Sequence, residues 1–226
     1  MRTDDRDACL AAYDAWAATY DAIDNPLIAQ AAVVLDARAA WLAGARVLEL
    51  GCGTGRNAVA CLAAGASTYV GVDASPGMLA RARERVVDPR ASWIEADLVA
   101  GAARASGAFD VVLVCLVLEH VEATFPVLAA AAAELAPGGK LFVIELHASL
   151  HDRGVGANFE IGGCEVRIAS FRHEARDLLR EIERVGLRTL DAVDHVPSPA
   201  ALARSAKLAR YAGTPVLLEL VATKGA

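Results

Sequence analysis

Apolar residues recur every three or four positions along residues 4–42, a spacing that is typical of amphipathic helices. The dipeptide Asn25-Pro26 interrupts this stripe, because proline disfavours the helical conformation in the residue before it. The pattern therefore predicts two helices, with the second covering about residues 27–42.

From residue 45 onward, short apolar runs typical of strands alternate with segments of helical periodicity. The run at 109–118 is apolar on both faces, as expected for a strand covered by helices on both sides. Strands that alternate with helices indicate right-handed βαβ units and a parallel, doubly wound α/β sheet. The predicted strands are 45–51, 67–73, 91–98, 109–118 and 140–147, and the predicted helices are 56–65, 75–86 and 125–135.

After residue 147 the alternation stops and the chain becomes polar and rich in glycine. Residues 158–168 predict a hairpin that turns at Gly162-Gly163. An amphipathic helix is expected at 173–186, followed by strands at 187–196 and 215–223 with another helix inserted between them.

Length and composition favour one domain in the cytoplasm. The chain has 226 residues, of which 55% are hydrophobic, enough for a single substantial core. Its apolar runs stay well short of the ~18 residues of a membrane span. The acidic, polar N-terminus does not resemble a secretory signal, so we expect no membrane association.

Charge and cysteine spacing exclude further classes of function. The net charge is −6, whereas nucleic-acid binders usually carry a basic surplus, so we expect no nucleic-acid partner. The five cysteines show no C-x-x-C spacing, which argues against a disulfide framework and a zinc site. We expect no bound metal.

Three glycines in five residues, Gly51, Gly53 and Gly55, separate a predicted strand from a predicted helix. Such a turn favours a ligand site, with its backbone donors and the helix N-terminus facing the crevice at the carboxyl ends of the strands. The third glycine comes one position too early for the G-x-G-x-x-G fingerprint, and Arg56 stands in its place. The spacing therefore argues against a nicotinamide dinucleotide, and a phosphate-loop motif is absent as well.

Acidic residues follow the glycines at informative places. Asp73 ends the second predicted strand, where a carboxylate can accept hydrogen bonds from both hydroxyls of a ribose. Asp97 and Leu98 end the third strand, beside the place of an adenine ring, and Glu49 precedes the glycines. Glu49 and Asp73 are hard to explain as core residues, because unpaired buried carboxylates are costly in free energy.

The motifs ELGCGTG, GVDASPGML, EADL, FDVVLVCLVLEHV and LAPGGKLFVIE, in this order, resemble the class I S-adenosylmethionine (SAM)-dependent methyltransferases. The likeness is to the small-molecule branch with ubiquinone- and menaquinone-type enzymes, and it extends over residues 47–146. Residues 13–26 resemble that family's N-terminal lid. The resemblance implies a Rossmann-like, seven-stranded sheet with its last strand antiparallel. It also implies one domain over 1–226, with a lid at 1–44, a SAM-binding core at 45–147, and a substrate-side insertion and C-terminal strands at 148–226.

The resemblance also implies which residues hold SAM. The glycine loop would pack against its methionine part, Asp73 would take the ribose hydroxyls, and Tyr20 would close over the sulfonium. Packing on adenine, contact with its amino group and backbone contacts near the methionine amine complete the set. The implied cofactor-binding residues are Tyr20, Glu49, Gly51, Cys52, Gly53, Thr54, Gly55, Asn57, Asp73, Ala74, Met78, Asp97, Leu98, Cys115 and Leu116.

Methyl transfer from a sulfonium is an in-line displacement, in which positioning can supply much of the catalysis. A general base is needed only where the acceptor must lose a proton early, as a hydroxyl does. His120 is the leading candidate for that base, although it could instead cap a helix or hold the lid. Tyr20 and His147 are further catalytic candidates, whereas His173 is expected to cap a helix.

Acceptor recognition is expected from the lid and from the region after residue 147. Arg153 and Arg167 could bind an anionic or carbonyl-bearing acceptor, but such arginines more often face solvent. The aromatic stripe of the lid could equally be packing. The candidate substrate-binding residues are Tyr13, Trp16, His147, His151, Arg153, Phe159, Arg167 and Phe171.

The sequence lacks the D/N-P-P-Y/F tetrapeptide of methyltransferases that act on exocyclic amines of nucleic acids. We therefore expect methyl transfer to an O or N atom of a small molecule, by a monomer or homodimer. Methylation of a protein or tRNA, and SAM binding without methylation, stay open as alternatives.

Overall fold

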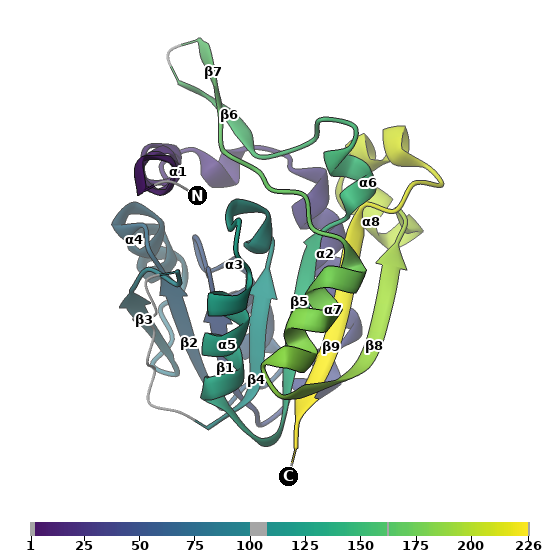
Figure 1. Cartoon of the computed structure of the whole chain (residues 1–226). Coiled ribbons are helices and arrows are strands. Elements are labelled where there is room, and N and C mark those ends of the chain that lie inside the picture. Colours follow the sequence, from purple (N-terminus) through teal and green to yellow (C-terminus); the bar gives the residue numbers. More distant parts are fainter. Residues whose placement is uncertain (1–2, 100–107, 162, 226) are drawn as a thin grey trace.

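The computed structural model describes residues 3–99, 108–161 and 163–225, and its centre is a seven-stranded sheet (Figure 1). The strand order is β3-β2-β1-β4-β5-β9-β8, and β6 and β7 form a separate two-stranded sheet. The strands are β1 (Arg46–Leu50), β2 (Thr68–Asp73), β3 (Ala91–Glu95), β4 (Phe109–Cys115), β5 (Leu135–Leu146), β6 (Asn158–Ile161), β7 (Cys164–Arg167), β8 (Leu187–His195) and β9 (Leu217–Lys224).

Helices cover both faces of the large sheet and its carboxyl edge (Figure 1). The α-helices are α1 (Thr3–Trp16), α2 (Pro26–Ala37), α3 (Arg56–Ala63), α4 (Pro76–Arg85), α5 (Phe125–Glu134), α6 (Ala148–His151), α7 (Ala175–Arg184) and α8 (Pro199–Arg204). Short 3-10 helices are η1 (Tyr20–Ala22), η2 (Ala39–Trp41), η3 (Leu118–His120) and η4 (Ala206–Tyr211).

The sheet topology confirms the predicted Rossmann-like fold. Strands β1 to β5 pair in parallel, and β9 runs antiparallel between β5 and β8. In the centre, Leu48 of β1 lies level with Val70 of β2 and Val112 of β4. This register brings the carboxyl ends of β1, β2 and β4 to one edge, which is where ligands bind in open α/β sheets.

Two hydrophobic layers sandwich the sheet. On one face, residues of α2, α3 and α8 pack with Val47, Leu113 and Phe142. On the other face, α5 and α7 pack with Leu48 and Val112. Adjacent residues of β1 thus point into opposite layers, as strand geometry requires. This two-sided burial explains the continuous apolar run that predicted β4.

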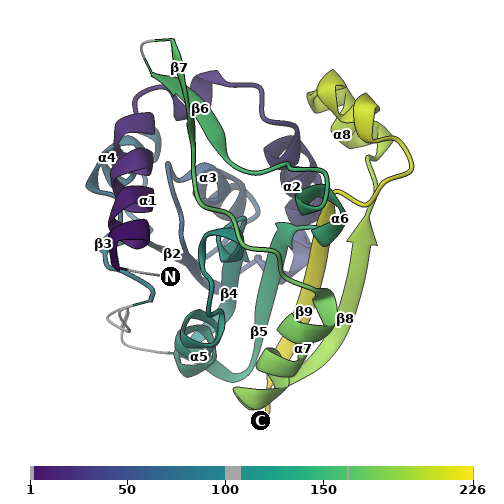
Figure 2. The same cartoon turned by 45° about the horizontal axis from the view of Figure 1, so that its top comes forward.

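Two segments stand over the carboxyl edge of the sheet (Figure 2). Helix α1 lies beside α4, and the β6–β7 hairpin extends outward from the body, with Cys164 exposed near its outer end. The hairpin confirms the prediction for 158–168, except that Gly162 lies outside the described residues. Core packing links the two segments, because Phe159 of the hairpin is buried against Trp16 of α1.

Helix starts follow the sequence signals, whereas some ends differ from the prediction. Asn25 caps α2, and Ser75 caps α4 with proline at its first position. The predicted strand at 109–118 ends at Cys115, because Leu116 turns the chain with a φ of 55°. The single helix expected between β8 and β9 is divided at Ser205 into α8 and η4. Across the part of the chain that the structure describes, no helix is long and apolar enough to span a membrane.

Candidate active site

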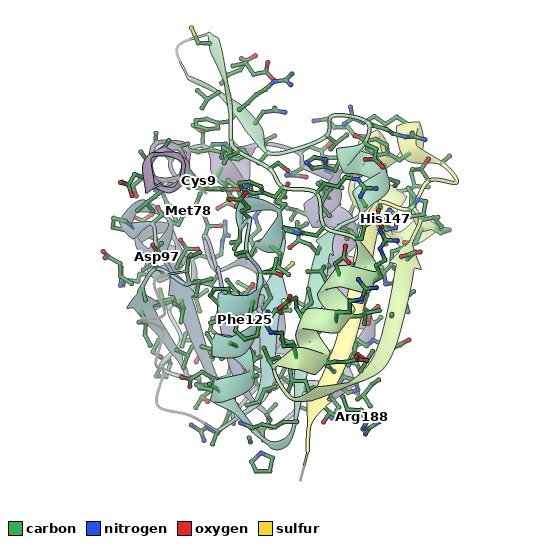
Figure 3. All side chains as sticks on the ribbon, viewed as in Figure 1. Cys9, Met78, Asp97, Phe125, His147 and Arg188 are labelled. Carbon is green, nitrogen blue, oxygen red and sulfur yellow. The ribbon has the colours of Figure 1, made fainter. Side chains whose placement is uncertain are left out.

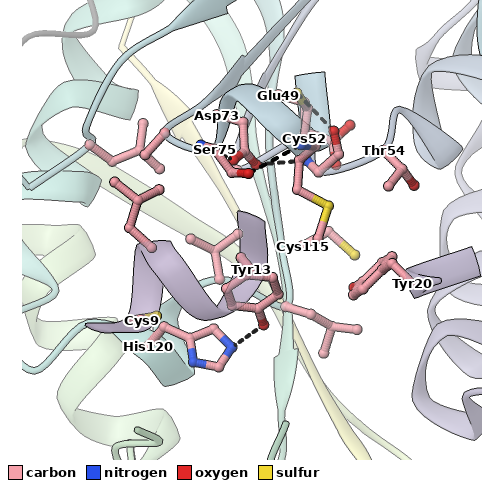
Figure 4. Close-up of a pocket in the computed structure, with 18 of the residues that line it drawn as sticks. Cys9, Tyr13, Tyr20, Glu49, Cys52, Thr54, Asp73, Ser75, Cys115 and His120 are labelled. Atoms are coloured by element: carbon pink, nitrogen blue, oxygen red, sulfur yellow. Dashed lines mark hydrogen bonds between the residues drawn. The ribbon is translucent and has the colours of Figure 1, made fainter. Parts of the chain in front are cut away.

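A cavity of about 220 Å³ lies at the carboxyl edge of the sheet, under the lid (Figure 4). Its walls come from α1, η1 and α2, from the ends of β1, β2 and β4, and from η3. The cavity brings together fourteen of the fifteen predicted cofactor-binding residues, all except Gly55. It also contains His120 and Tyr13.

The glycine loop forms one wall, and all three of its glycines have positive φ angles, a conformation that other residues rarely adopt. A Cβ on Gly51 would collide with the side chain of Val117, whereas one on Gly53 would meet no atom within 4 Å. The turn therefore leaves a bare stretch of backbone that a ligand can approach closely. Gly55 faces Trp93 and Ala82 instead, which explains its absence from the cavity wall.

The loop amides do not face the crevice as predicted. The N–H groups of Gly51 and Cys52 donate to the carbonyl of Val72, at 2.8 and 3.0 Å. The N–H of Gly53 donates to Asp73 Oδ2 at 2.8 Å. These donors hold the loop against β2, so these three amides are not free to bind a ligand, and the loop contributes its shape and the bare backbone at Gly53.

Asp73 is oriented by backbone groups on both sides. Its Oδ2 accepts from Gly53, and its Oδ1 accepts from the N–H of Ser75 at 2.9 Å. Burial raises the pKa of Asp73, while these hydrogen bonds oppose the shift. A carboxylate has about four acceptor sites, so Asp73, which lines the cavity, can still accept from a ligand hydroxyl.

Glu49 has partners that sequence reasoning missed. The hydroxyl of Tyr69 donates to Oε2, and Asn57 Nδ2 donates to Oε1 at 2.7 Å. Burial raises the pKa of Glu49 to about 7. The carboxyl group is therefore a supported part of the cavity wall rather than an unpaired acid.

The cavity wall also includes the residues expected near an adenine ring, among them Met78 and Leu98, which are 1% and 7% exposed. Asp97 lines the cavity as well, and its Oδ1 accepts from the N–H of Val99 at 2.8 Å. An apolar slot with a carboxylate at its rim can bind a flat base and accept from its amino group.

Two aspartates hold the lid over the cavity. Asp14 of α1 accepts from the hydroxyl of Ser75 and from the N–H of Gly77, both at 2.7 Å. Asp21 of η1 forms ion pairs with Arg56, at 2.6 Å, and with Arg85. Because Arg56 and Arg85 come from α3 and α4, the lid is fastened to the two helices that begin at the cavity.

Beyond β4, the chain turns sharply around a buried carboxylate. Leu116 adopts its left-handed conformation here, an unfavourable state that often marks functional sites. Glu145 of β5 accepts from the N–H groups of Val117 and Leu118, at 3.0 and 2.6 Å, and from that of Leu146 at 2.8 Å. Glu145 thereby holds η3, the short helix that presents His120 to the cavity.

The insertion after β5 holds the same short helix from its other side. The N–H of Phe171 donates to the carbonyl of Glu119 at 2.6 Å, and Ser170 Oγ donates to Glu119 Oε2 at 3.3 Å. His173 Nε2 lies 2.9 Å from the carbonyls of both Leu118 and Val121. The predicted capping role of His173 is wrong, since α7 begins after Glu174 without a side-chain cap.

The acceptor candidates from the insertion lie elsewhere. His147 caps α6 and places Nε2 3.3 Å from Asp194, and Figure 3 shows it on the opposite side of the molecule from Cys9 and Met78. His151 Nε2 bonds to the carbonyl of Ser170 at 3.2 Å. None of the remaining candidates lines the described cavity: Trp16 and Phe159 stack on each other, Phe171 is half-buried, and Arg153 and Arg167 are exposed, with Arg167 paired to Glu165.

Several cavity residues escaped the sequence analysis. Cys9, Leu10 and Ile28 come from the lid, and Val117 and Val121 flank His120. The helical stripe contains Leu10 but gives no sign of which partner it meets, because periodicity identifies a face and not its contacts. The other lining residues that were not predicted are Asp7, Ala31, Arg56, Ser75 and Val99.

Comparison with known proteins agrees with this geometry. Residues 47–139 match a family model described as a methyltransferase domain. Over these residues the chain is similar to that family. The predicted resemblance to the class I SAM-dependent methyltransferases is thereby confirmed.

A curated relative and two solved structures extend the comparison beyond the methyltransferase domain. The ubiquinone biosynthesis O-methyltransferase of Xanthomonas oryzae pv. oryzae is 38% identical over 135 residues, covering 56% of this chain and 54% of the relative. The chain therefore spans about half the length of that relative. The DhpI–SAH complex has a TM-score of 0.71 at 21% identity, covering 97% of each chain. The 4+2 cyclase SpnF has a TM-score of 0.58 at 20% identity, covering 84% of this chain and 81% of SpnF.

At these identities the two solved structures establish the fold alone. The roles of the individual residues, the domain limits, the cytoplasmic location and the oligomeric state stay predictions.

Proposed function

We propose that the chain binds SAM and transfers its methyl group to an oxygen or nitrogen atom of a small molecule. The observation that carries the proposal is the position of Asp73, whose carboxylate is fastened to the glycine loop while facing the cavity. The methyltransferase domain and the relative named as an O-methyltransferase support the same function.

The residues present fit the cofactor. Asp73 would accept from the ribose hydroxyls, Asp97 and Leu98 would bind the adenine end, and Glu49 would attract the methionine ammonium group. The bare backbone at Gly53 leaves room for the methionine part. Tyr20, whose ring packs 5.2 Å from the guanidinium carbon of Arg56, would cover the sulfur.

The charge of the cavity also suits a cationic ligand. Four of its lining residues are acidic: Asp7, Glu49, Asp73 and Asp97. Arg56 is the basic residue among the described lining residues, and Asp21 forms an ion pair with it. A surplus of carboxylates stabilises positive charge, which SAM carries on its sulfonium and ammonium groups.

Bound SAM supplies a methyl group on a positively charged sulfur, which is already a good leaving group. The protein then has to orient the acceptor and exclude water. His120 lines the cavity and would take a proton from an acceptor hydroxyl, the role of a general base.

A small-molecule acceptor is favoured because the lid covers the cavity. Asp14 and Asp21 hold α1 and η1 against α3 and α4, so the lid narrows access to the cavity, which suits a small acceptor better than a protein or tRNA. Arg153 and Arg167 lie outside this space, so the cavity offers no support for the anionic acceptor that they suggested.

SAM binding without methylation is the second candidate, since this fold also occurs in a cyclase. The two functions share the ligand and differ in turnover. Production of S-adenosylhomocysteine (SAH) from SAM with a metabolite panel would support methyl transfer, whereas binding without turnover on any acceptor would support the alternative.

Cofactor binding is tested by calorimetric titration with SAH and by mass spectrometry of ligands that co-purify with the protein. Asp73→Ala removes an acceptor for two donors, and hydrogen bonds to charged groups contribute about 1.5–3 kcal/mol each. We expect a loss of affinity of about 100-fold or more. The matched control is Asp36→Ala, which breaks an exposed ion pair with Arg204 and leaves the site intact. Equal affinities in the two variants would contradict the proposed role of Asp73.

A further inference from the structure

Tyr13 of the lid and His120 of η3 meet inside the cavity, although they lie 107 positions apart in the sequence. The Tyr13 hydroxyl oxygen lies 2.7 Å from His120 Nε2 (Figure 4). The two rings meet edge to face, with centroids 5.3 Å apart. The contact therefore joins the lid to the residue that is expected to serve as a general base.

The contact of the second ring nitrogen determines the tautomer of His120, and with it the donor in the hydrogen bond to Tyr13. Nδ1 lies 2.9 Å from the backbone carbonyl of Ala169, and a carbonyl can only accept. Nδ1 therefore carries the ring proton of the neutral imidazole. Nε2 is left as the acceptor, and the Tyr13 hydroxyl donates to it.

Burial keeps both groups in the protonation states that this arrangement needs. It lowers the pKa of His120, so the imidazole is neutral near neutral pH. It raises the pKa of Tyr13 well above the ordinary value for tyrosine, so the phenol keeps its proton. The tyrosine oxygen still has lone pairs that face the cavity and can accept from an acceptor hydroxyl.

We propose that Tyr13 receives the proton of the acceptor and passes its own proton to His120. The inference rests on the proposed methyl transfer and assigns the chemistry of its proton. An O–CH₃ bond forms on the acceptor, and the CH₃–S bond of the donor breaks with its electron pair remaining on sulfur. The acceptor's proton moves to Tyr13 Oη as the tyrosine proton moves to His120 Nε2, so the site ends with a neutral tyrosine and an imidazolium.

The surroundings of His120 stabilise that imidazolium. Glu119 Oε1 lies 3.8 Å from Nε2, and the carboxyl group of Glu145 is close enough to favour the charged ring. The carbonyl of Ala169 continues to accept from Nδ1–H after the transfer. A proton that reaches Nε2 of His120 is thus stabilised by nearby carboxyl groups, while Nδ1–H keeps its own acceptor.

The relay is complete only while the lid is closed. Tyr13 lies in α1, and Asp14, the next residue, fastens α1 to the start of α4. If α1 moves away, His120 keeps its place through Ala169 but loses the hydroxyl that connects it to the acceptor. Lid closure would therefore assemble the proton path and enclose the acceptor in one step.

The hydrogen bond is tested without turnover, by following the ring nitrogens of His120 with NMR through a pH titration of the SAH-bound protein. A donor to Nε2 favours the neutral ring. Tyr13→Phe should therefore raise the pKa of His120, while Tyr211→Phe, which removes a tyrosine hydroxyl outside the cavity, should leave it unchanged. An unchanged His120 pKa in Tyr13→Phe, or a ring protonated on Nε2 in the neutral wild-type protein, would overturn the relay.

Turnover then tests its chemical role, with phenol and 4-nitrophenol as the probe acceptors. Phenol must lose its proton during the reaction, whereas 4-nitrophenol is already ionised at alkaline pH. Tyr13→Phe should slow methylation of phenol by about 10²–10⁴-fold, the usual range for lost general acid–base catalysis. The variant should slow methylation of 4-nitrophenol far less. An equal decrease in the rates for both acceptors would show that Tyr13 has a structural role only.

SAH titration keeps this inference separate from the proposed function. A wild-type protein that binds no SAH contradicts the proposed function itself. If the Tyr13→Phe variant binds SAH normally but the pKa of its His120 is unchanged, the relay alone is contradicted. Should no phenol be methylated, the pKa of His120 still decides whether the hydrogen bond exists.

Discussion

Asp21 and Arg56 join the lid to the helix that follows the glycine loop, with 2.6 Å between Oδ1 and Nε. Arg56 therefore both lines the cavity and anchors its cover. The same aspartate pairs with Arg85 of α4, so one carboxylate bridges three elements. Opening the lid requires these contacts to break, which makes Asp21 a control point for the exchange of ligands.

Asp21→Asn should loosen the lid without unfolding the protein. The side chains of this cluster are 27–29% exposed, and partly exposed ion pairs contribute only about 1 kcal/mol. We expect faster hydrogen exchange across residues 8–22, and SAH dissociation that is about fivefold faster. Asp36→Asn serves as the control, because it breaks an ion pair with Arg204 away from the lid. Unchanged exchange in Asp21→Asn would show that other contacts hold the lid.

Glu49 should make the protein less stable as the pH rises through neutrality. Its pKa is raised from an ordinary 4.5 to about 7 in the folded protein, so the folded state binds a proton more readily than the unfolded chain. The resulting stabilisation is complete at pH values below the ordinary pKa and is lost as the pH rises through about 7. Between about pH 5.5 and pH 8, the free energy of unfolding should fall by about 2 kcal/mol on account of this group.

Glu49→Gln tests the pH effect, because glutamine cannot titrate. Urea unfolding at both pH values should show a smaller difference than in the wild-type protein. Glu84→Gln is the control, since Glu84 is 66% exposed in a surface pair with Arg81. A pH dependence that survives in full in Glu49→Gln would assign it to other buried carboxyls, such as Glu119 and Glu145, whose pKa values burial also raises.

Phe159→Ala should detach the β6–β7 hairpin from the lid. Phe159 is 3% exposed and stacks on Trp16 with ring centroids 4.7 Å apart. Removing a buried phenylalanine ring typically costs about 3–5 kcal/mol. We expect faster hydrogen exchange in β6 and β7 and a changed tryptophan fluorescence, with much of the effect recovered in Phe159→Leu. A variant with wild-type exchange in the hairpin would contradict the importance of this stack.

The sequence predicted the central sheet well because its signals are local. Alternating apolar runs identified β1, β2 and β4, and the spacing of Gly51, Gly53 and Gly55 identified the loop that they support. The cofactor side of the cavity followed, since parallel strands bring their carboxyl ends to one edge.

The acceptor side could not be predicted in the same way, because tertiary contacts define it. The hydrogen bond from Tyr13 to His120 joins residues 107 positions apart. The tautomer of His120 depends on a backbone carbonyl at Ala169, which leaves no mark in side-chain type. Histidines that follow a strand looked alike in sequence, yet His120 lines the cavity and His147 caps a helix.

The exposed thiol of Cys164 at the hairpin offers a site for selective chemical labelling. Burial raises the pKa of Cys9, Cys52, Cys61 and Cys115, and the thiolate is the form that reacts with maleimides. A fluorophore would therefore attach first at Cys164, outside the cavity. With Trp41 and Trp93 replaced, energy transfer from Trp16 to that dye would follow the movement of the lid relative to the hairpin in real time, with no engineered cysteine required.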